Sequence, residues 1–161
     1  MAAIPVPVRA SVRDLIGDLV GKSVSVAPAP APQQLNGRPA YAATYRFDDG
    51  RVAGLTVCDL PAALAMGAAI GFMPRPDAEA ELAENGELAG DLLEFFREVV
   101  NVFAKLLNSP MTPHVALREL DRVPGKVRAD AAAVALSPSA RVDYEVIVDG
   151  FDPGMLTVLV A

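Results

Sequence analysis

Glu98 and Asn101 lie three residues apart in a mostly apolar stretch, REVVNVFAKLLN. In a helix this spacing places both side chains on one face, about one turn apart. A carboxylate can pair with a cation on a partner, and an amide offers a donor and an acceptor together, so it can hold and orient a water molecule. The combination suits attack on a phosphoryl group, where catalysis is mostly positioning and electrostatics. It does not suit acyl transfer, because no nucleophile or base stands beside it.

The pair belongs to a polar stripe on a long amphipathic helix, predicted from about Glu87 to Asn108. The polar positions advance by 3, 4, 3, 4 and 3 residues and fall within an arc of roughly 100°. They are Asp91, Glu94, Glu98, Asn101, Lys105 and Asn108. The plain interpretation is a solvated helix face, since every surface helix needs one.

Two small penalties permit a functional interpretation of this stripe without requiring one. Glu94 and Glu98 stand at i and i+4, where like charges repel by a few tenths of a kcal/mol. Asn101 is a mediocre helix former in mid-helix, worse than Ala by roughly half a kcal/mol. We therefore take Glu98 and Asn101 as the candidate catalytic pair, with Asp91, Glu94 and Lys105 bordering a docking surface.

The elements that must position this helix can be read from periodicity and turn residues. Helices are predicted at 11–20 with Ser11 near its N-cap, after Asp59 and Pro61 in LPAALAMGAAIGF, at 77–84 and at 87–108. Strands are predicted at 22–27, 41–47, 51–59, 113–120, 126–136, 142–150 and 154–160, with a hairpin turn at Asp48-Asp49-Gly50. This order predicts a single α+β domain over residues 1–161, with helices packed on one face of a largely antiparallel sheet.

Composition excludes several classes of protein. Hydrophobic residues make up 52% of the 161 residues and charged residues 21%, which is typical of a globular protein. The net charge of −6 and the lack of a basic stripe exclude nucleic acid and anionic membranes as expected partners. The longest apolar stretch, LPAALAMGAAIGFM, is too short to span a bilayer. With one cysteine, Cys58, and no signal peptide in MAAIPVPVRAS, we expect a cytoplasmic protein.

The segment ELAGDLLEFFREVVNVFAKLLN, with Glu98-x-x-Asn101 on an amphipathic helix, resembles the signature helix of the CheC/CheX chemotaxis phosphatases. The order of elements is also similar: a leading amphipathic helix, a hairpin, a small-residue helix, the motif helix, and then SPMTPHVAL opening a strand. The helix LPAALAMGAAIGF, as the candidate counterpart of the motif helix, has no Glu or Asn. One motif per chain resembles the CheX type.

The resemblance implies a specific reaction and partner. Members of that family dephosphorylate the receiver-domain protein CheY. By position, Glu98 would pair with the receiver's lysine, and Asn101 would orient water at its aspartyl phosphate. The chain itself would bind no cofactor, because Mg²⁺ would belong to the receiver. CheX-type proteins are homodimers, which this chain is expected to share.

Two alternatives stay open at this point. The same fold could serve as a catalytically silent module that docks a receiver or another regulatory protein through the acidic stripe. A self-associating structural domain could instead use the terminal strands, 142–150 and 154–160, as a paired sheet edge.

Overall fold

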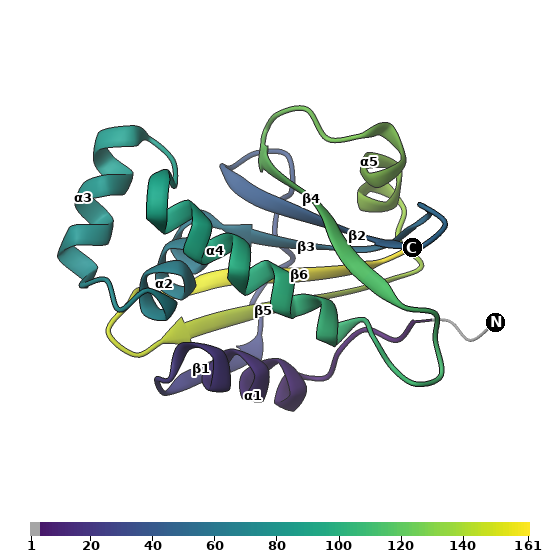
Figure 1. Cartoon of the computed structure of the whole chain (residues 1–161), viewed down its shortest axis with the longest axis horizontal. Coiled ribbons are helices and arrows are strands. Elements are labelled where there is room, and N and C mark those ends of the chain that lie inside the picture. Colours follow the sequence, from purple (N-terminus) through teal and green to yellow (C-terminus); the bar gives the residue numbers. More distant parts are fainter. Residues whose placement is uncertain (1–3) are drawn as a thin grey trace.

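The computed structural model describes residues 4–161, in which one six-stranded antiparallel sheet carries helices on both faces (Figure 1). The helices are α1 (Arg9–Val20), α2 (Leu60–Ile70), α3 (Arg75–Asn85), α4 (Gly90–Val102), the 3-10 helix η1 (Phe103–Leu106) and α5 (Ala129–Leu136). The strands are β1 (Val24–Pro28), β2 (Ala40–Phe47), β3 (Val52–Asp59), β4 (Val115–Val123), β5 (Ala140–Val148) and β6 (Gly154–Val160). The predicted α+β class with a largely antiparallel sheet is confirmed. Helices α1, α2 and α4 pack on one face, as predicted, and α5 lies on the other.

The sheet order, β1-β5-β6-β3-β2-β4, shows that the chain consists of two similar halves that exchange a strand. Each half runs helix, strand and hairpin: α1, β1 and β2–β3 in the first half, α4, β4 and β5–β6 in the second. The first strand of each half pairs with the hairpin of the other, β1 with β5 and β4 with β2. The hairpins meet at the centre through β3 and β6. This arrangement has an approximate twofold symmetry that relates α1 to α4.

Alternation along the strands divides the core between the two faces of the sheet. Tyr41, Ala43 and Tyr45 point to the face covered by α1, α2 and α4, and they belong to the larger core cluster. Ala42 and Leu55 point to the opposite face and pack in a smaller cluster with Ala131 of α5. The hairpin predicted around Asp48-Asp49-Gly50 is present, with β2 and β3 paired on either side of it.

Two buried tyrosines of β2 hold the two ends of the α4 region. The Tyr41 hydroxyl accepts a hydrogen bond from the backbone N–H of Leu88, 2.9 Å away, and its ring packs against Phe96. The Tyr45 hydroxyl donates to the carbonyl of Val100 at 2.5 Å. Burial raises the pKa of Tyr45. Both hydroxyls need partners in the core: the backbone just before α4 supplies the partner of Tyr41, and the backbone of α4 supplies that of Tyr45.

Four sequence predictions are corrected. The segment 126–136 contains helix α5 rather than a strand, because its alanines favour helix and Ala131 packs on the far face of the sheet. Helix α1 begins at Arg9 with Val8 as its N-cap, so Ser11 lies inside the helix. The long helix covers less than 87–108, since α4 ends at Val102 and continues as η1.

The fourth correction concerns the sheet edges. The terminal strands β5 and β6 each have two neighbours, so they are interior strands. The edge strands are β1 and β4. A paired edge made of residues 142–150 and 154–160 is therefore wrong. No helix between residues 4 and 161 has the length and apolar character needed to cross a bilayer.

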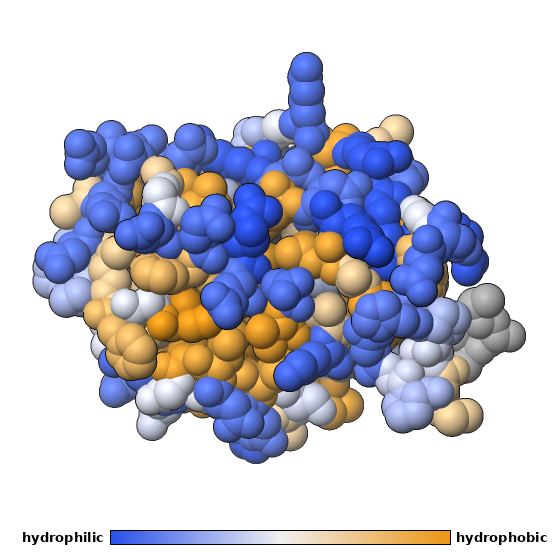
Figure 2. Space-filling model, in the orientation of Figure 1, coloured by the Kyte–Doolittle hydropathy of each residue, from blue (hydrophilic) through white to orange (hydrophobic). Residues whose placement is uncertain are grey.

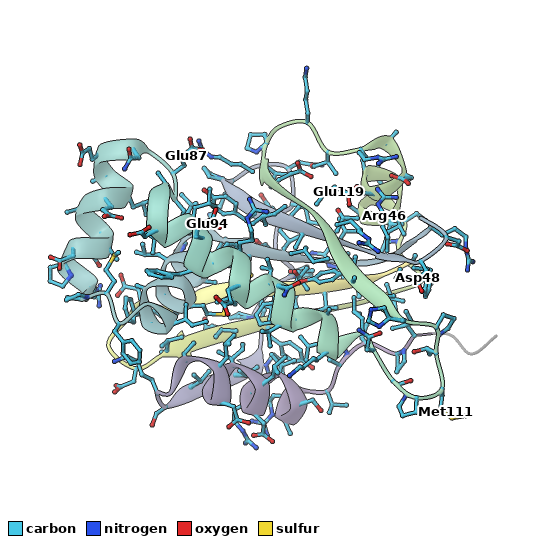
Figure 3. All side chains as sticks on the ribbon, in the orientation of Figure 1. Arg46, Asp48, Glu87, Glu94, Met111 and Glu119 are labelled. Atoms are coloured by element: carbon cyan, nitrogen blue, oxygen red, sulfur yellow. The ribbon has the colours of Figure 1, made fainter. Side chains whose placement is uncertain are left out.

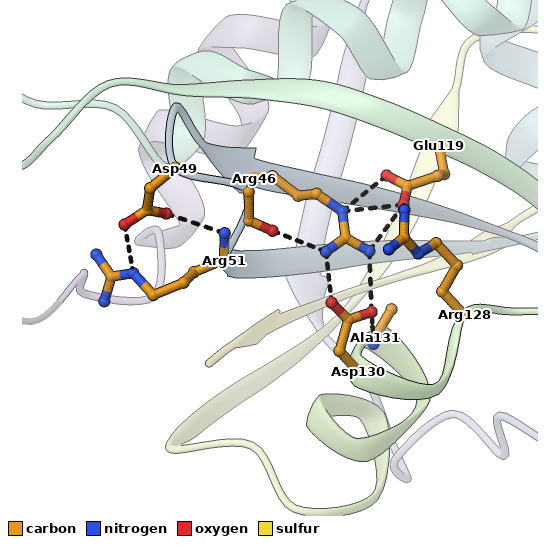
Figure 4. A network of polar contacts seen from close by, with 8 residues as sticks. Arg46, Asp49, Arg51, Glu119, Arg128, Asp130 and Ala131 are labelled. Atoms are coloured by element: carbon orange, nitrogen blue, oxygen red, sulfur yellow. Dashed lines mark hydrogen bonds and ion pairs between the residues drawn. The ribbon is translucent and has the colours of Figure 1, made fainter.

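Arg46 joins β2, β4, the β2–β3 turn and α5 through one buried guanidinium (Figure 4). Its Nε donates to both carboxylate oxygens of Glu119, and Nη1 and Nη2 donate to Asp130 at 2.6 and 3.0 Å. Nη1 also donates to the Gly50 carbonyl at 2.9 Å. The hydrogen bonds from Arg46 lower the pKa of Asp130 to about 2. This network attaches α5 to the sheet.

Replacing the buried cation is expected to cost far more than replacing an exposed one. Arg46→Met leaves the largely buried Glu119 carboxylate without its main partner, and should lower the free energy of unfolding by about 2–4 kcal/mol. Arg51→Met, which removes an exposed ion pair with Asp49, should change it by less than about 1 kcal/mol. Urea denaturation of the two variants measures both values. Equal losses would contradict the assignment of Arg46 as the link between α5 and the sheet.

Asn108 lies on the expected polar stripe but is a structural residue. Its amide nitrogen donates to the carbonyls of Ala104 and Val115, and its amide oxygen accepts from the N–H of Val115 at 2.9 Å. These bonds attach the end of η1 to the start of β4.

We expect the two asparagines of this segment to respond differently to the same substitution. Asn108→Ala should lower the free energy of unfolding by about 1–3 kcal/mol, because it leaves partly buried backbone groups of Val115 unpaired. Asn101→Ala should change it by less than about 0.5 kcal/mol, because Asn101 is exposed. Thermal or urea unfolding of the two variants measures both changes. A large fall in the free energy of unfolding of Asn101→Ala would mean that the Asn101 amide has a structural partner.

Candidate functional site

The outer face of α4 carries four of the five predicted site residues. Asp91, Glu94, Glu98 and Asn101 are all exposed, while Leu92, Phe96, Val99 and Val100 are the buried residues of the same helix. The division predicted from the helical wheel is therefore present in the structure. Lys105 is exposed as well, but it belongs to η1, one short helix further along the chain.

The side chains of Glu98 and Asn101 take no part in the polar contacts that stabilise the described part of the fold. Within residues 4–161 neither side chain forms a hydrogen bond or an ion pair, in contrast to Asn108 seven residues after Asn101. Glu94, labelled in Figure 3, has Arg97 at 3.8 Å, a long contact between two exposed side chains. The carboxylate of Glu98 is thus available to a cation from outside, and the amide of Asn101 to a water molecule.

The helix backbone at Val100, next to Asn101, is held by contacts with the core. Val100 precedes Asn101 and is buried, so its side chain points into the core and leaves the approach to Asn101 open. The carbonyl of Val100 accepts the hydrogen bond from Tyr45, a residue for which the sequence analysis gives only a place in the predicted strand 41–47. A buried phenol requires a hydrogen-bond partner, which is the signal that could have pointed to such a contact.

Small residues of α2 allow the helix bearing the pair to pack closely. A side-chain carbon added at Gly67 would lie 3.3 Å from the Leu92 carbonyl and from Cβ of Phe96. At Gly71 it would overlap the ring of Phe95. All residues of α2 from Ala62 to Ala69 are buried, so this helix serves as support for α4 and offers no polar face.

The surroundings of the pair combine acidic and apolar surface. Figure 2 shows polar atoms along α4 and an apolar area between α4 and α1. Half-buried side chains of α1 and of η1, which continues α4, pack at the edge of the core, among them Leu15, Leu19 and Leu106. A partner that brings a cation to Glu98 can therefore also bury apolar surface beside it.

The true counterpart of the motif helix is α1, which corrects the prediction that it is LPAALAMGAAIGF. The twofold relation of the halves pairs α1 with α4 and the η1 that continues it. The buried Val12, Ile16 and Val20 of α1 can be aligned with the buried Val99 of α4, Phe103 of η1 and Leu107 directly after η1, which have the same four-residue spacing. In this register Ser11 and Asp14 occupy the places of Glu98 and Asn101. The conclusion of one Glu-x-x-Asn pair per chain stands.

Other residues considered for chemistry lie elsewhere. Cys58 is buried, and burial raises the pKa of its thiol. His114 is exposed just before β4. A pocket of about 350 Å³ lies on the opposite face of the sheet, between α5 and strands β2 and β3, and its lining includes Leu55, Val57 and Leu136. Among residues 4–161 no group of three potential metal ligands comes together.

Comparison of the sequence with known proteins finds nothing. No protein-family model matches the chain, and no curated protein sequence matches it.

Comparison of the structure identifies the fold. The chain is similar to one in the crystal structure of the FliM–SpeE complex from H. pylori, with a TM-score of 0.64 and 12% identity over 94% of this chain and 80% of the other. Similarity to FliY from Thermotoga maritima gives a TM-score of 0.53 and 10% identity over 97% and 85% of the two chains.

A third similar structure is the CheX–CheY–BeF3–Mg²⁺ complex from Borrelia burgdorferi. The TM-score is 0.51 and the identity 10%, covering 91% of this chain and 90% of the other. The predicted resemblance to the CheC/CheX type is thereby confirmed at the level of the fold. The chain has the fold that the FliM middle domain, FliY and CheX share.

Proposed function

We propose that the chain is a phosphatase that acts on the aspartyl phosphate of a response-regulator receiver domain through the single pair Glu98 and Asn101. The observation that carries the proposal is the state of this pair: exposed, without a partner among residues 4–161, and fixed on a helix held by Tyr41 and Tyr45. The fold adds support, since one similar structure holds CheX together with CheY, BeF3 and Mg²⁺.

In the proposed reaction the two side chains have different tasks. Glu98 pairs with a lysine of the receiver and so aligns the two proteins. The Asn101 amide holds a water molecule opposite the aspartyl oxygen, through its carbonyl as acceptor and its N–H as donor. The water oxygen forms a bond to phosphorus as the bond to the aspartyl oxygen breaks. The products are the free aspartate carboxylate and inorganic phosphate.

The remaining polar residues of the helix serve docking in this proposal. Asp91 and Glu94 extend the acidic face toward the start of α4, and Lys105 stands beyond Asn101 on η1. The chain contributes no metal, because the Mg²⁺ that neutralises the phosphoryl group belongs to the receiver. We further propose a cytoplasmic protein that works as a homodimer.

A catalytically silent docking module is the second candidate. The similarity to FliM in a complex with another protein, SpeE, supports it. In such a module the acidic residues would matter for binding, and Asn101 would be dispensable.

Phosphate loss from a charged receiver separates the two candidates. With a receiver loaded with Mg²⁺ and acetyl phosphate, the native chain should accelerate dephosphorylation, and Asn101→Ala should lower that acceleration by about 10² or more, because the water loses its orienting group. Glu98→Ala should lower kcat/KM by about tenfold or more, because the lysine on the receiver loses its partner. Receivers encoded near this chain are the ones to try.

Two matched variants control the assay. Asn36→Ala and Glu84→Ala remove exposed side chains of the same types outside the α4 face and should leave the rate unchanged. Receiver binding by the native chain with no acceleration of phosphate loss would favour the silent module. Equal rates for native chain and Asn101→Ala would overturn the role assigned to the amide.

A further inference from the structure

Phe72, two residues after the end of α2, combines two features that reduce stability. Its side chain is 90% exposed, the largest value among the exposed large hydrophobic residues between 4 and 161. Its φ is +54°, and within that range it is the one residue other than glycine with a positive φ. Bulky side chains adopt this left-handed conformation at a cost, and an exposed ring gains nothing from burial.

The local hydrogen bonds show why the backbone turns at this residue. The N–H of Phe72 donates to the carbonyl of Ala69 at 3.2 Å, and that of Met73 to the carbonyl of Ala68 at 2.8 Å. This pattern closes the C-terminal end of α2 and is usually made with glycine or asparagine in the left-handed position. Either residue would satisfy the turn better than phenylalanine, so the needs of the fold do not explain Phe72.

The position of Phe72 points to the α4 face. The preceding residue, Gly71, lies against the ring of Phe95 so closely that a side-chain carbon there would overlap it. Phe95 is half-buried and stands three residues before Glu98, a rise of about 4.5 Å along the helix. An interface of ordinary size covers about 800 Å² on each partner. A partner centred on Glu98 and Asn101 would therefore reach the end of α2.

We propose that Phe72 is the aromatic anchor through which the chain docks the phosphorylated receiver domain, an inference that rests on the proposed function. The partner then presents a lysine to Glu98 and an apolar surface to Phe72, beside its phosphorylated aspartate. Exposed aromatic residues that become buried on association carry much of the binding energy in many interfaces. Phe72 acts on affinity and leaves the hydrolytic step to Glu98 and Asn101.

Substitutions that suit the left-handed turn test this without damaging the fold. Phe72→Asn and Phe72→Gly should keep or raise the melting temperature, because both residues accept this backbone conformation. They should raise the KM for the phosphorylated receiver about 10- to 30-fold with kcat unchanged. The same variants should bind a receiver charged with Mg²⁺ and beryllofluoride correspondingly more weakly in calorimetry, which needs no turnover.

Leu136→Asn supplies the matched control, since Leu136 is 78% exposed on α5, across the sheet from α4. It should change neither KM nor affinity. If the native chain and Phe72→Asn bind the charged receiver equally well, Phe72 is not the docking anchor, and the proposed function is unaffected. If the native chain neither binds nor dephosphorylates any receiver, both are overturned. A native dimer that Phe72→Asn converts to monomers, with KM unchanged, would assign Phe72 to contact between two copies.

Discussion

The hydrogen bond from the Tyr45 hydroxyl to the carbonyl of Val100 is the contact on which the candidate site depends most directly. A phenol buried in the core must find a partner, and this one finds it in the helix backbone at the residue before Asn101. Tyr41, on the same face of β2, makes the corresponding contact near the other end of the helix, at Leu88. The hydrogen bonds from these two sheet residues therefore fix how α4 is rotated about its own axis, and so which of its side chains face away from the sheet.

Because these two hydrogen bonds and the core hold α4 in place, the exposed residues of α4 are not needed to stabilise the fold. The buried side of the helix packs on the sheet and on α2, where Gly67 lets the two helices approach closely. Where the fold does need a polar side chain, it uses it fully: Arg46 binds Glu119, Asp130 and Gly50, and Asn108 makes three hydrogen bonds. Glu98 and Asn101 make none with residues 4–161. The fold therefore does not require these two residue types, which is consistent with a role in contact with another molecule.

The sequence predicts local features well and long-range features poorly. The amphipathic wheel of 87–108 placed Asp91, Glu94, Glu98 and Asn101 correctly, because a helical face follows from spacing alone. The same reasoning placed Asn108 on the polar stripe and missed its structural role. Its partners Ala104 and Val115 lie in η1 and at the start of β4, which helical spacing alone does not reveal. The strand exchange between the halves has no signal in spacing, because pairing of β1 with β5 depends on residues more than a hundred positions apart. The segment 126–136 was predicted as a strand although its alanines favour helix, and only the contacts of Asp130 and Ala131 show where helix α5 lies.

The two halves of the chain allow a comparison within one molecule. Helices α1 and α4 occupy related places over the same sheet, and the alignment of Val12, Ile16 and Val20 with Val99, Phe103 and Leu107 places Ser11 and Asp14 where the second half has Glu98 and Asn101. The frame therefore does not dictate a carboxylate and an amide at these places. Asp14 is close to Arg13, at 3.2 Å, so its charge already has a neighbour, whereas the Glu98 carboxylate stands without a partner among residues 4–161. Of these two helices, only α4 presents a carboxylate without a partner among residues 4–161 together with an amide one turn away, and this asymmetry is what makes that helix the candidate site.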